Sequence, residues 1–395
     1  MTIREFRIYL DHNSTAPLLP EAGEALLAAL SLTGNPSSVH AEGRRVRSLV
    51  EDARRKVASL LHAEPENIVF TSGATEAANT CLTPHWMQDG NELVLSGLAV
   101  SDADHPATRE GGRFEFSKVR RLPVDPAGVL RLDALDVWIA ESHAPRMLSL
   151  TLANSETGVI QPLIPVVERL KGTGILLILD IVQAAGRIDL AEAAEHADAL
   201  LVSGHKIGAA KGIGAYALRR AGLRPFPLLV GGGQERRHRA GTEAVPLIAG
   251  FGAAAEVAQR RLATEAETTL KLRERLLKAI EASGASHLLL GAAAERLPNT
   301  VTIAAPGLRA ETAQIALDLA GFAVSSGSAC SSGKVGPSHV LEAMQTGGLA
   351  IDAAAGAIRV SFGYETTESE IDQFSEAFIR LLRRAEASEA GRVAA

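Results

Sequence analysis

Short apolar runs alternate with segments of helical composition through the first 220 residues. These runs do not alternate between apolar and polar positions, and most of them break at a glycine or a polar residue. They are ENIVFTSG (66–73), NELVLSG (91–97), RMLSLTLANSETG (146–158), GILLILDIVQ (174–183), ADALLVSGHKIGA (197–209) and GIGAYALRR (212–220). Strands this apolar are typically buried on both faces, as in a mainly parallel sheet covered by helices. We therefore predict an α/β fold.

The pattern changes after about residue 250. EVAQRRLATEAETTLKLRERLLKAIEAS (256–283) has the charge and spacing of one long amphipathic helix. Beyond it we predict a strand in LPNTVTIAAPG, a helix in ETAQIALDLAG and a strand in IRVSFG. This order of predicted helices and strands indicates a second, smaller α+β domain. We predict a large domain over residues 16–255 and a small one built from residues 1–15 and 256–395.

Composition narrows the class of protein. The 395 residues are 46% hydrophobic and 22% charged, with a net charge of −6, which argues against nucleic acid or an anionic membrane as the main partner. Two cysteines cannot form a disulfide framework and fit a reducing compartment. The N-terminus has no long apolar core, and no run reaches the length of a membrane helix. We expect a cytoplasmic protein without a metal site.

Polar side chains follow several of the predicted strands, where a parallel α/β sheet binds its ligand. Asp180 and Lys206 lie about one strand–helix–strand unit apart, so we expect both near the same edge of the sheet. Lys206, among Ser203, His205 and small residues, is a candidate nucleophilic amine. An ordinary Asp–Lys ion pair is the alternative, and it is slightly favoured on this evidence alone.

The stretch TSGATEAANT (71–80) is a candidate phosphate site. Gly73 ends a strand and Ala74-Thr75 opens a helix, whose free N–H groups and dipole can hold an anion. Plain N-capping by Thr71 or Ser72 is the favoured alternative for this turn considered alone.

Together these features predict one cofactor. Pyridoxal phosphate needs a phosphate cradle, a Schiff-base lysine and an acid opposite its ring nitrogen. Thr75, Lys206 and Asp180 meet these needs in turn. His105, in SDADHPATR, offers an imidazole that could stack on the ring or move protons. An ordinary surface histidine is an equally good interpretation of His105 from the sequence alone.

Eleven segments, in order from residue 8 to about 363, resemble the cysteine desulfurases of the class V aminotransferase group of pyridoxal-phosphate enzymes. GHKIGAAKGIGA combined with SSGSAC is the most specific part of this resemblance. The segments are YLDHNSTAPL, GNPSSVHAEGR, VFTSGATEAAN, DADHPA, ANSETGVIQPL, LDIVQAAG, SGHKIGAAKGIGA, GGGQERRHRAGT, LPNT, VSSGSACSSG and IRVSFG. The resemblance implies the fold of the aspartate aminotransferase-like PLP transferases.

The resemblance also implies residue roles. Lys206 would bond to the cofactor, Asp180 would pair with its ring nitrogen and Gln183 would face its phenolic oxygen, with His105 over the ring. The phosphate would be held by Ala74 (through its backbone), Thr75, Ser203, His205 and, from the neighbouring subunit of a homodimer, Thr242. Asn154 and Ser155 belong to the motif that contacts the cofactor. Arg359 would bind the substrate carboxylate, as a forked guanidinium suits, and Asn35 would line the mouth of the site unless it is only a turn residue.

The implied reaction converts L-cysteine to L-alanine and leaves a persulfide on Cys330, which passes to a sulfur-acceptor protein for iron–sulfur cluster or thio-cofactor assembly. Small residues surround Cys330 in SSGSACSSG (325–333), and they give a thiolate mobility and access. The other cysteine, Cys81, is predicted to be a buried small hydrophobe.

Two departures from the family pattern stand out. Ser155 occupies the place of a second asparagine that normally contacts the cofactor, and its hydroxyl offers fewer hydrogen bonds than an amide. Ala210 occupies a place where proline is common, which indicates a less rigid loop.

Two alternatives to a cysteine desulfurase stay open. One is another class V enzyme, such as a selenocysteine lyase or transaminase, and the other is a weakly active partner-binding homologue.

Overall fold

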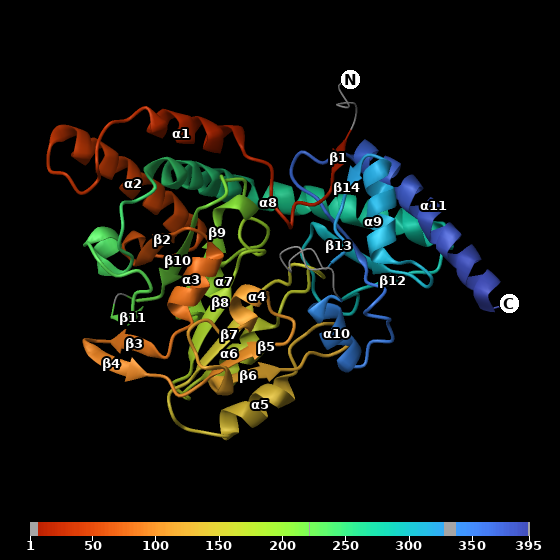
Figure 1. Cartoon of the computed structure of the whole chain (residues 1–395), viewed down its shortest axis with the longest axis horizontal. Coiled ribbons are helices and arrows are strands. Elements are labelled where there is room, and N and C mark those ends of the chain that lie inside the picture. Colours follow the sequence, from red (N-terminus) through yellow and green to blue (C-terminus); the bar gives the residue numbers. More distant parts are fainter. Residues whose placement is uncertain (1–6, 221, 328–336, 394–395) are drawn as a thin grey trace.

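A computed structural model describes residues 7–220, 222–327 and 337–393 of the chain. A seven-stranded sheet lies at the centre of its larger part, in the order β2-β10-β9-β8-β7-β5-β6 (Figure 1). Strand β10 is antiparallel to both neighbours, whereas β9, β8, β7, β5 and β6 run parallel. The bounds are β2 (Ile68–Thr71), β5 (Leu98–Ser101), β6 (Val119–Leu122), β7 (Met147–Thr151), β8 (Leu176–Asp180), β9 (Ala199–Ser203) and β10 (Gly214–Leu218). The predicted mainly parallel α/β sheet is confirmed.

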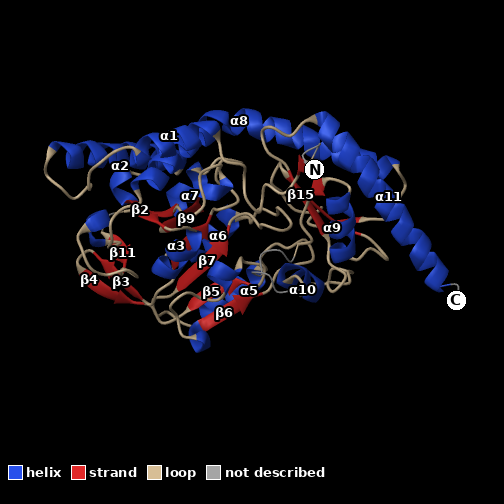
Figure 2. Ribbon diagram, turned by 45° about the horizontal axis from the view of Figure 1, so that its top comes forward, coloured by secondary structure: helices blue, strands red, loops and turns tan. Residues whose placement is uncertain are grey.

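Helices cover both faces of this sheet (Figure 2). Along β8, Leu177 and Leu179 join one apolar core while Leu176 and Ile178 join another, because successive strand side chains point to opposite faces. The first core is covered by α1 (Pro20–Leu30), α2 (Ala41–Leu60), α5 (Leu132–Ala140), α6 (Leu163–Leu170), α7 (Ala191–His196) and the first half of α8 (Val245–Ala282). The second is covered by α3 (Ala74–Cys81) and α4 (Pro106–Arg109). Cys81 is fully buried there, as predicted.

The smaller part has its own apolar core. Its elements are β12 (Leu288–Leu289), β13 (Thr300–Ala304), β15 (Ile358–Ser361), α9 (Ala310–Leu319), α10 (His339–Thr346) and α11 (Glu368–Val393), and β1 (Ile8–Tyr9) pairs in parallel with β14 (Phe322–Ala323). Helix α8 runs through both parts, with Ala258 in the first core and Leu272 in the small-part core (Figure 1). The domain boundary at 255/256 falls within this helix and stays a prediction.

Two sequence-based expectations need correction. NELVLSG forms β4 (Asn91–Val94), which belongs not to the main sheet but to a small antiparallel sheet with β3 (His85–Gln88) and β11 (Leu223–Pro225). The long helix begins at Val245 rather than at 256, because its first turns are apolar and pack into the large core. Four 3-10 turns complete the described elements: η1 (Pro65–Asn67), η2 (Phe116–Lys118), η3 (Gly204–Lys206) and η4 (Gln234–Arg237).

The sequence of the edge strand β6 lacks the apolar pattern that predicted the other strands. It reads VRRL, and Arg120 and Arg121 form surface ion pairs with Glu141 and Glu110. Charged side chains on an edge strand are common because they discourage pairing with other chains, and they hide the apolar pattern. Among the helices of the described residues, none is both long and apolar enough to cross a membrane.

Gly214 fixes how closely β10 approaches the turn at Gly73. A Cβ atom at Gly214 would lie 2.6 Å from the carbonyl oxygen of Val202 and 2.8 Å from the Cα atom of Gly73. We expect Gly214→Ala to lower the free energy of unfolding by about 1–3 kcal/mol in a denaturant titration, since packed backbone must move.

Gly233 provides a matched control, because a Cβ atom there meets no atom within 4 Å and its φ is −85°. We expect Gly233→Ala to change the free energy of unfolding by less than about 0.5 kcal/mol. Equal effects of the two substitutions would show that the contact with Gly73 is unimportant.

Candidate active site

A cavity of about 550 Å³ opens at the carboxyl ends of the parallel strands. Each strand of a parallel sheet delivers its following loop to this one edge, so residues distant in sequence meet there. The cavity brings together these predicted site residues: Ala74, Thr75, His105, Ser155, Asp180, Gln183, Ser203, His205 and Lys206.

Lys206 closes the 3-10 turn η3 directly after β9 and lines the cavity. Its Nζ atom donates hydrogen bonds to the carbonyl oxygens of Asn13, at 2.6 Å, and Ser14, at 2.7 Å. The N-terminal segment therefore holds the amine in place within the cavity.

Asp180 is the last residue of β8 and its side chain is buried. One carboxylate oxygen accepts a hydrogen bond from the backbone N–H of Val182 at 2.9 Å. Burial raises the pKa of Asp180, and the nearby His105 and Lys206 oppose that rise. A buried carboxylate in this position favours a cationic partner in the cavity.

His105 is the N-cap of α4 and reaches the cavity from the loop after β5. Its Nδ1 atom accepts a hydrogen bond from the backbone N–H of Ala107 at 3.1 Å. Burial lowers the pKa of His105 below its usual value; Asp180 opposes this shift and Lys206 adds to it. The imidazole is therefore neutral at neutral pH, with its hydrogen on Nε2.

The turn before α3 has the features of an anion site. Gly73 is the N-cap residue and makes no side-chain cap, so N-capping by Thr71 or Ser72, the favoured alternative, is wrong. The first N–H groups of a helix have no partner within it and attract anions. Gly73, Ala74 and Thr75 all line the cavity.

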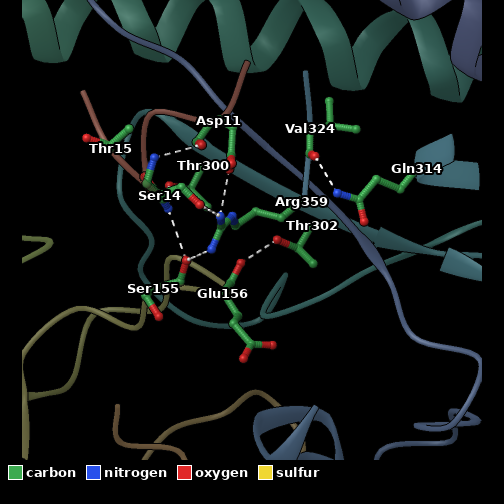
Figure 3. A network of polar contacts seen from close by, with 12 residues as sticks. Asp11, Ser14, Thr15, Ser155, Glu156, Thr300, Thr302, Gln314, Val324 and Arg359 are labelled. Carbon is green, nitrogen blue, oxygen red and sulfur yellow. Dashed lines mark hydrogen bonds and ion pairs between the residues drawn. The ribbon is translucent and has the colours of Figure 1, made fainter. Parts of the chain in front are cut away.

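Arg359 is fully buried on β15, so it is not an exposed charge at the end of a strand. Its guanidinium donates to the Asp11 carboxylate at 2.7 Å, to Ser14 Oγ at 3.2 Å and to the carbonyl oxygen of Ser155 at 2.9 Å (Figure 3). Since Ser14 and Ser155 line the cavity, Arg359 lies directly behind its wall.

Besides Arg359, three predicted residues within the described part of the chain do not line the cavity. The amide oxygen of Asn154 accepts from the N–H groups of Glu156 and Thr157 in its own loop, and its amide nitrogen donates to the carbonyl oxygen of Ala103, in the loop after β5, at 2.8 Å. Asn35 stabilises the turn between α1 and α2 by accepting from the N–H of Ser37 at 2.8 Å. Thr242 is exposed on the surface and does not line the cavity. Cys330 lies outside the described residues.

Sequence reasoning missed several polar side chains of the cavity, among them those of Ser14, Thr15 and Lys211. Thr15 Oγ1 lies 3.2 Å from His205 Nδ1. Burial lowers the pKa of His205 to about 4, and the positive charges of Lys206 and Lys211 contribute to that shift. The short stretch AAKG, just beyond a strand end, was a signal for Lys211. Ser14 and Thr15 precede the first helix and gave no comparable signal.

Comparison with known proteins agrees with this geometry. The sequence profile of the aminotransferase class-V family matches residues 8–374. A cysteine desulfurase of Trichormus azollae is 38% identical over 381 residues, covering 95% of this chain and 93% of the relative. Cysteine desulfurase IscS 1 of Archaeoglobus fulgidus is 34% identical, covering 95% and 97% of the two chains. A solved NifS-like protein from Rickettsia africae matches with a TM-score of 0.83 at 29% identity, covering 95% and 99%. The chain therefore belongs to the class-V aminotransferase family.

Proposed function

We propose that this protein is a pyridoxal-phosphate-dependent cysteine desulfurase. It converts L-cysteine to L-alanine and transfers the sulfur, through a persulfide, to an acceptor protein. One observation carries the proposal: Lys206, Asp180 and the turn at Ala74 converge on a single cavity. The curated relatives described above are named cysteine desulfurases.

The donor and acceptor groups of the cavity fit pyridoxal phosphate. The buried carboxylate of Asp180 suits a protonated ring nitrogen, because each charge offsets the desolvation of the other. The N-terminal turn of α3, with Ser203 and His205, suits a phosphate group. When bound, the cofactor supplies an electron sink for carbanion chemistry at the amino acid.

Lys206 and His105 are the proton carriers of the proposed mechanism. Both line the cavity, and the neutral imidazole of His105 can donate its Nε2 proton and take it back in a later step. The carbonyl oxygens of Asn13 and Ser14 orient the Lys206 amine before substrate arrives.

Arg359 is the proposed anchor for the substrate carboxylate. Asp11 and the carbonyl oxygen of Ser155 hold its guanidinium in one plane, so little side-chain entropy is lost when an anion binds (Figure 3). Arg359 contacts the hydroxyl of Ser14 and the backbone carbonyl of Ser155, two residues that line the cavity.

Cys330 is the proposed sulfur acceptor within the chain. As a thiolate it attacks the sulfur of L-cysteine, so that the carbon–sulfur bond breaks and a sulfur–sulfur bond forms. L-Cysteine and the Cys330 thiol thereby give L-alanine and the Cys330 persulfide, with no other oxidant or reductant. The persulfide sulfur then passes to a carrier or scaffold protein for iron–sulfur cluster or thio-cofactor assembly.

The active form in this proposal is a homodimer. Phe226, Leu229 and Val230 expose apolar side chains in the loop that leads to Thr242, which supports contact with a second copy. Arg239, three residues before Thr242, binds Glu76 on the first turn of α3 at 2.9 Å. This ion pair holds the loop next to the proposed phosphate site, where Thr242 can reach the neighbouring subunit.

The direct test measures products from purified protein given pyridoxal phosphate, L-cysteine and a reductant. We expect a visible absorption band, together with equal amounts of sulfide and alanine. Lys206→Ala should abolish turnover because the amine that exchanges with substrate is lost. Cys330→Ser should lower sulfide release at least about 100-fold while the visible band stays, since the thiolate acts after cofactor binding.

Each outcome has a clear meaning. A wild-type protein that binds the cofactor but releases no sulfide is not a desulfurase. Undiminished sulfide from Cys330→Ser would remove this cysteine from the mechanism. Amino-group exchange with a keto acid, in place of sulfide release, would establish the transaminase alternative.

Ser155 offers a second test, at the one departure from the family motif inside the cavity. Ser155→Asn should lower the KM for L-cysteine about 5-fold, because an amide adds hydrogen-bond donors toward the substrate carboxylate. Ser155→Ala is the control for loss of the hydroxyl alone, and its KM should not fall. Steady-state rates of sulfide production at varied L-cysteine concentration give the KM of each variant. A KM that rises in Ser155→Asn would contradict the proposed carboxylate position.

A further inference from the structure

Arg187 is a buried cation in the turns that follow β8. Its N–H bonds to the carbonyl oxygen of Ala184 at 2.9 Å, and this turn brings residue 187 next to residue 183. Burial lowers the pKa of Arg187 to about 10, so the guanidinium stays charged at neutral pH. A buried cation is costly, and its contacts therefore call for an explanation.

The guanidinium is directed at Gln183. Arg187 Nη1 donates to the backbone carbonyl oxygen of Gln183 at 2.8 Å and also to its side-chain Oε1. Arginine carries only donors, so the amide oxygen of Gln183 must face Arg187. The amide nitrogen then faces the other way, where Nε2 donates to the carbonyl oxygen of Asn13 at 3.0 Å.

The same carbonyl oxygen of Asn13 accepts the hydrogen bond from Lys206 Nζ at 2.6 Å. The amide nitrogen of Gln183 and the amine of Lys206 therefore meet at one atom, beside the cavity that both side chains line. A flipped amide would present an acceptor to Asn13 and a donor to Arg187, and both contacts would become repulsive.

A nearby carboxylate, that of Glu265, helps to compensate the buried charge of Arg187. A second cavity, of about 80 Å³, is lined by His12, Arg187, Lys206, Arg261 and Glu265 among others. The carboxylate of Glu265 on α8 partly offsets the burial of Arg187. Arg261 lines the same cavity but lies over the ring of Tyr364, 4.3 Å from its centroid.

We propose that Arg187 is a positioning residue that locks the Gln183 amide with its N–H groups toward the cavity. In that orientation Gln183 donates to the phenolic oxygen of bound pyridoxal phosphate and so tunes the proton affinity of the cofactor joined to Lys206. This inference rests on the proposed function, because it requires that cofactor in this cavity.

The experiment is a pH titration of the visible absorption band of the holoenzyme, without substrate. In Arg187→Met only the hydrogen bond to Asn13 still orients the amide, so the hydrogen bond from Gln183 to the phenolic oxygen is weakened. We expect the midpoint of the titration to rise by about 0.5–1 pH unit. Arg261→Met removes a charge from the same cavity without touching Gln183, and its midpoint should move by less than half as much.

A double-mutant cycle separates positioning from simple loss of charge. If Arg187 acts through Gln183, then Arg187→Met should add no further shift in a Gln183→Ala background. A purely electrostatic role would give the same shift in both backgrounds. Arg187→Lys keeps the charge and a donor, and its midpoint should return at least halfway from the Arg187→Met value to that of the wild type.

The outcomes distinguish the two proposals. A wild-type protein with no visible band would overturn the proposed function. A wild-type band together with equal midpoints for Arg187→Met and Arg261→Met would overturn the positioning role alone. If Arg187→Met does not fold, Arg187→Lys tests the same coupling. It is introduced into the wild type and into the Gln183→Ala variant. Shifts of the titration midpoint that are equal in the two backgrounds would overturn the positioning role.

Discussion

The buried carboxylate of Asp180 is the constraint on which the site depends. It ends the central strand β8, where the sheet is apolar on both faces, and burial raises its pKa. A negative charge in such a place requires compensating positive charge nearby. The positive charge of Lys206 favours its ionised form, and the cavity leaves room for a cationic group from a cofactor.

The N-terminal segment turns this strand edge into a closed site. The carbonyl oxygen of Asn13 receives hydrogen bonds from Lys206 and from Gln183, while the Asn13 side chain donates to the carbonyl oxygen of Ser155 at 3.2 Å. A single residue thus connects the amine, the amide and the loop after β7. Its backbone carbonyl cannot be removed by substitution, which makes this connection robust to side-chain change.

The smaller part of the molecule contributes through Arg359. Strand β15 carries it to the back of the cavity, where Asp11 and the Ser155 loop hold it (Figure 3). Residues from the N-terminal segment, the large sheet and the small sheet therefore share one buried network. A change in how the two parts pack would move Arg359 relative to Lys206, so the proposed role of Arg359 links domain packing to substrate binding.

The sequence alone determined the parts of the site that depend on local order. Apolar runs identify β8 and β9, and their spacing predicts that Asp180 and Lys206 meet, because parallel strands end at one edge. The turn at Gly73 was also recognisable locally, because the glycine separates an apolar run from a segment of helical composition. The resemblance to a family supplied Gln183 and Arg359 without their surroundings.

Only the tertiary structure decided which groups hold these residues. Asn13 and Lys206 are far apart in sequence, as are Asp11 and Arg359, and no periodicity marks such pairs. Asn154 belongs to a site-like motif, yet its amide links the loop after β7 to the carbonyl oxygen of Ala103 after β5 and does not line the cavity. Nothing in the sequence distinguished Arg187 from an exposed arginine in a turn, and only the tertiary structure shows that it is buried. Local sequence patterns indicate burial and the positions of strands, whereas the partner of a polar group depends on how separate segments pack.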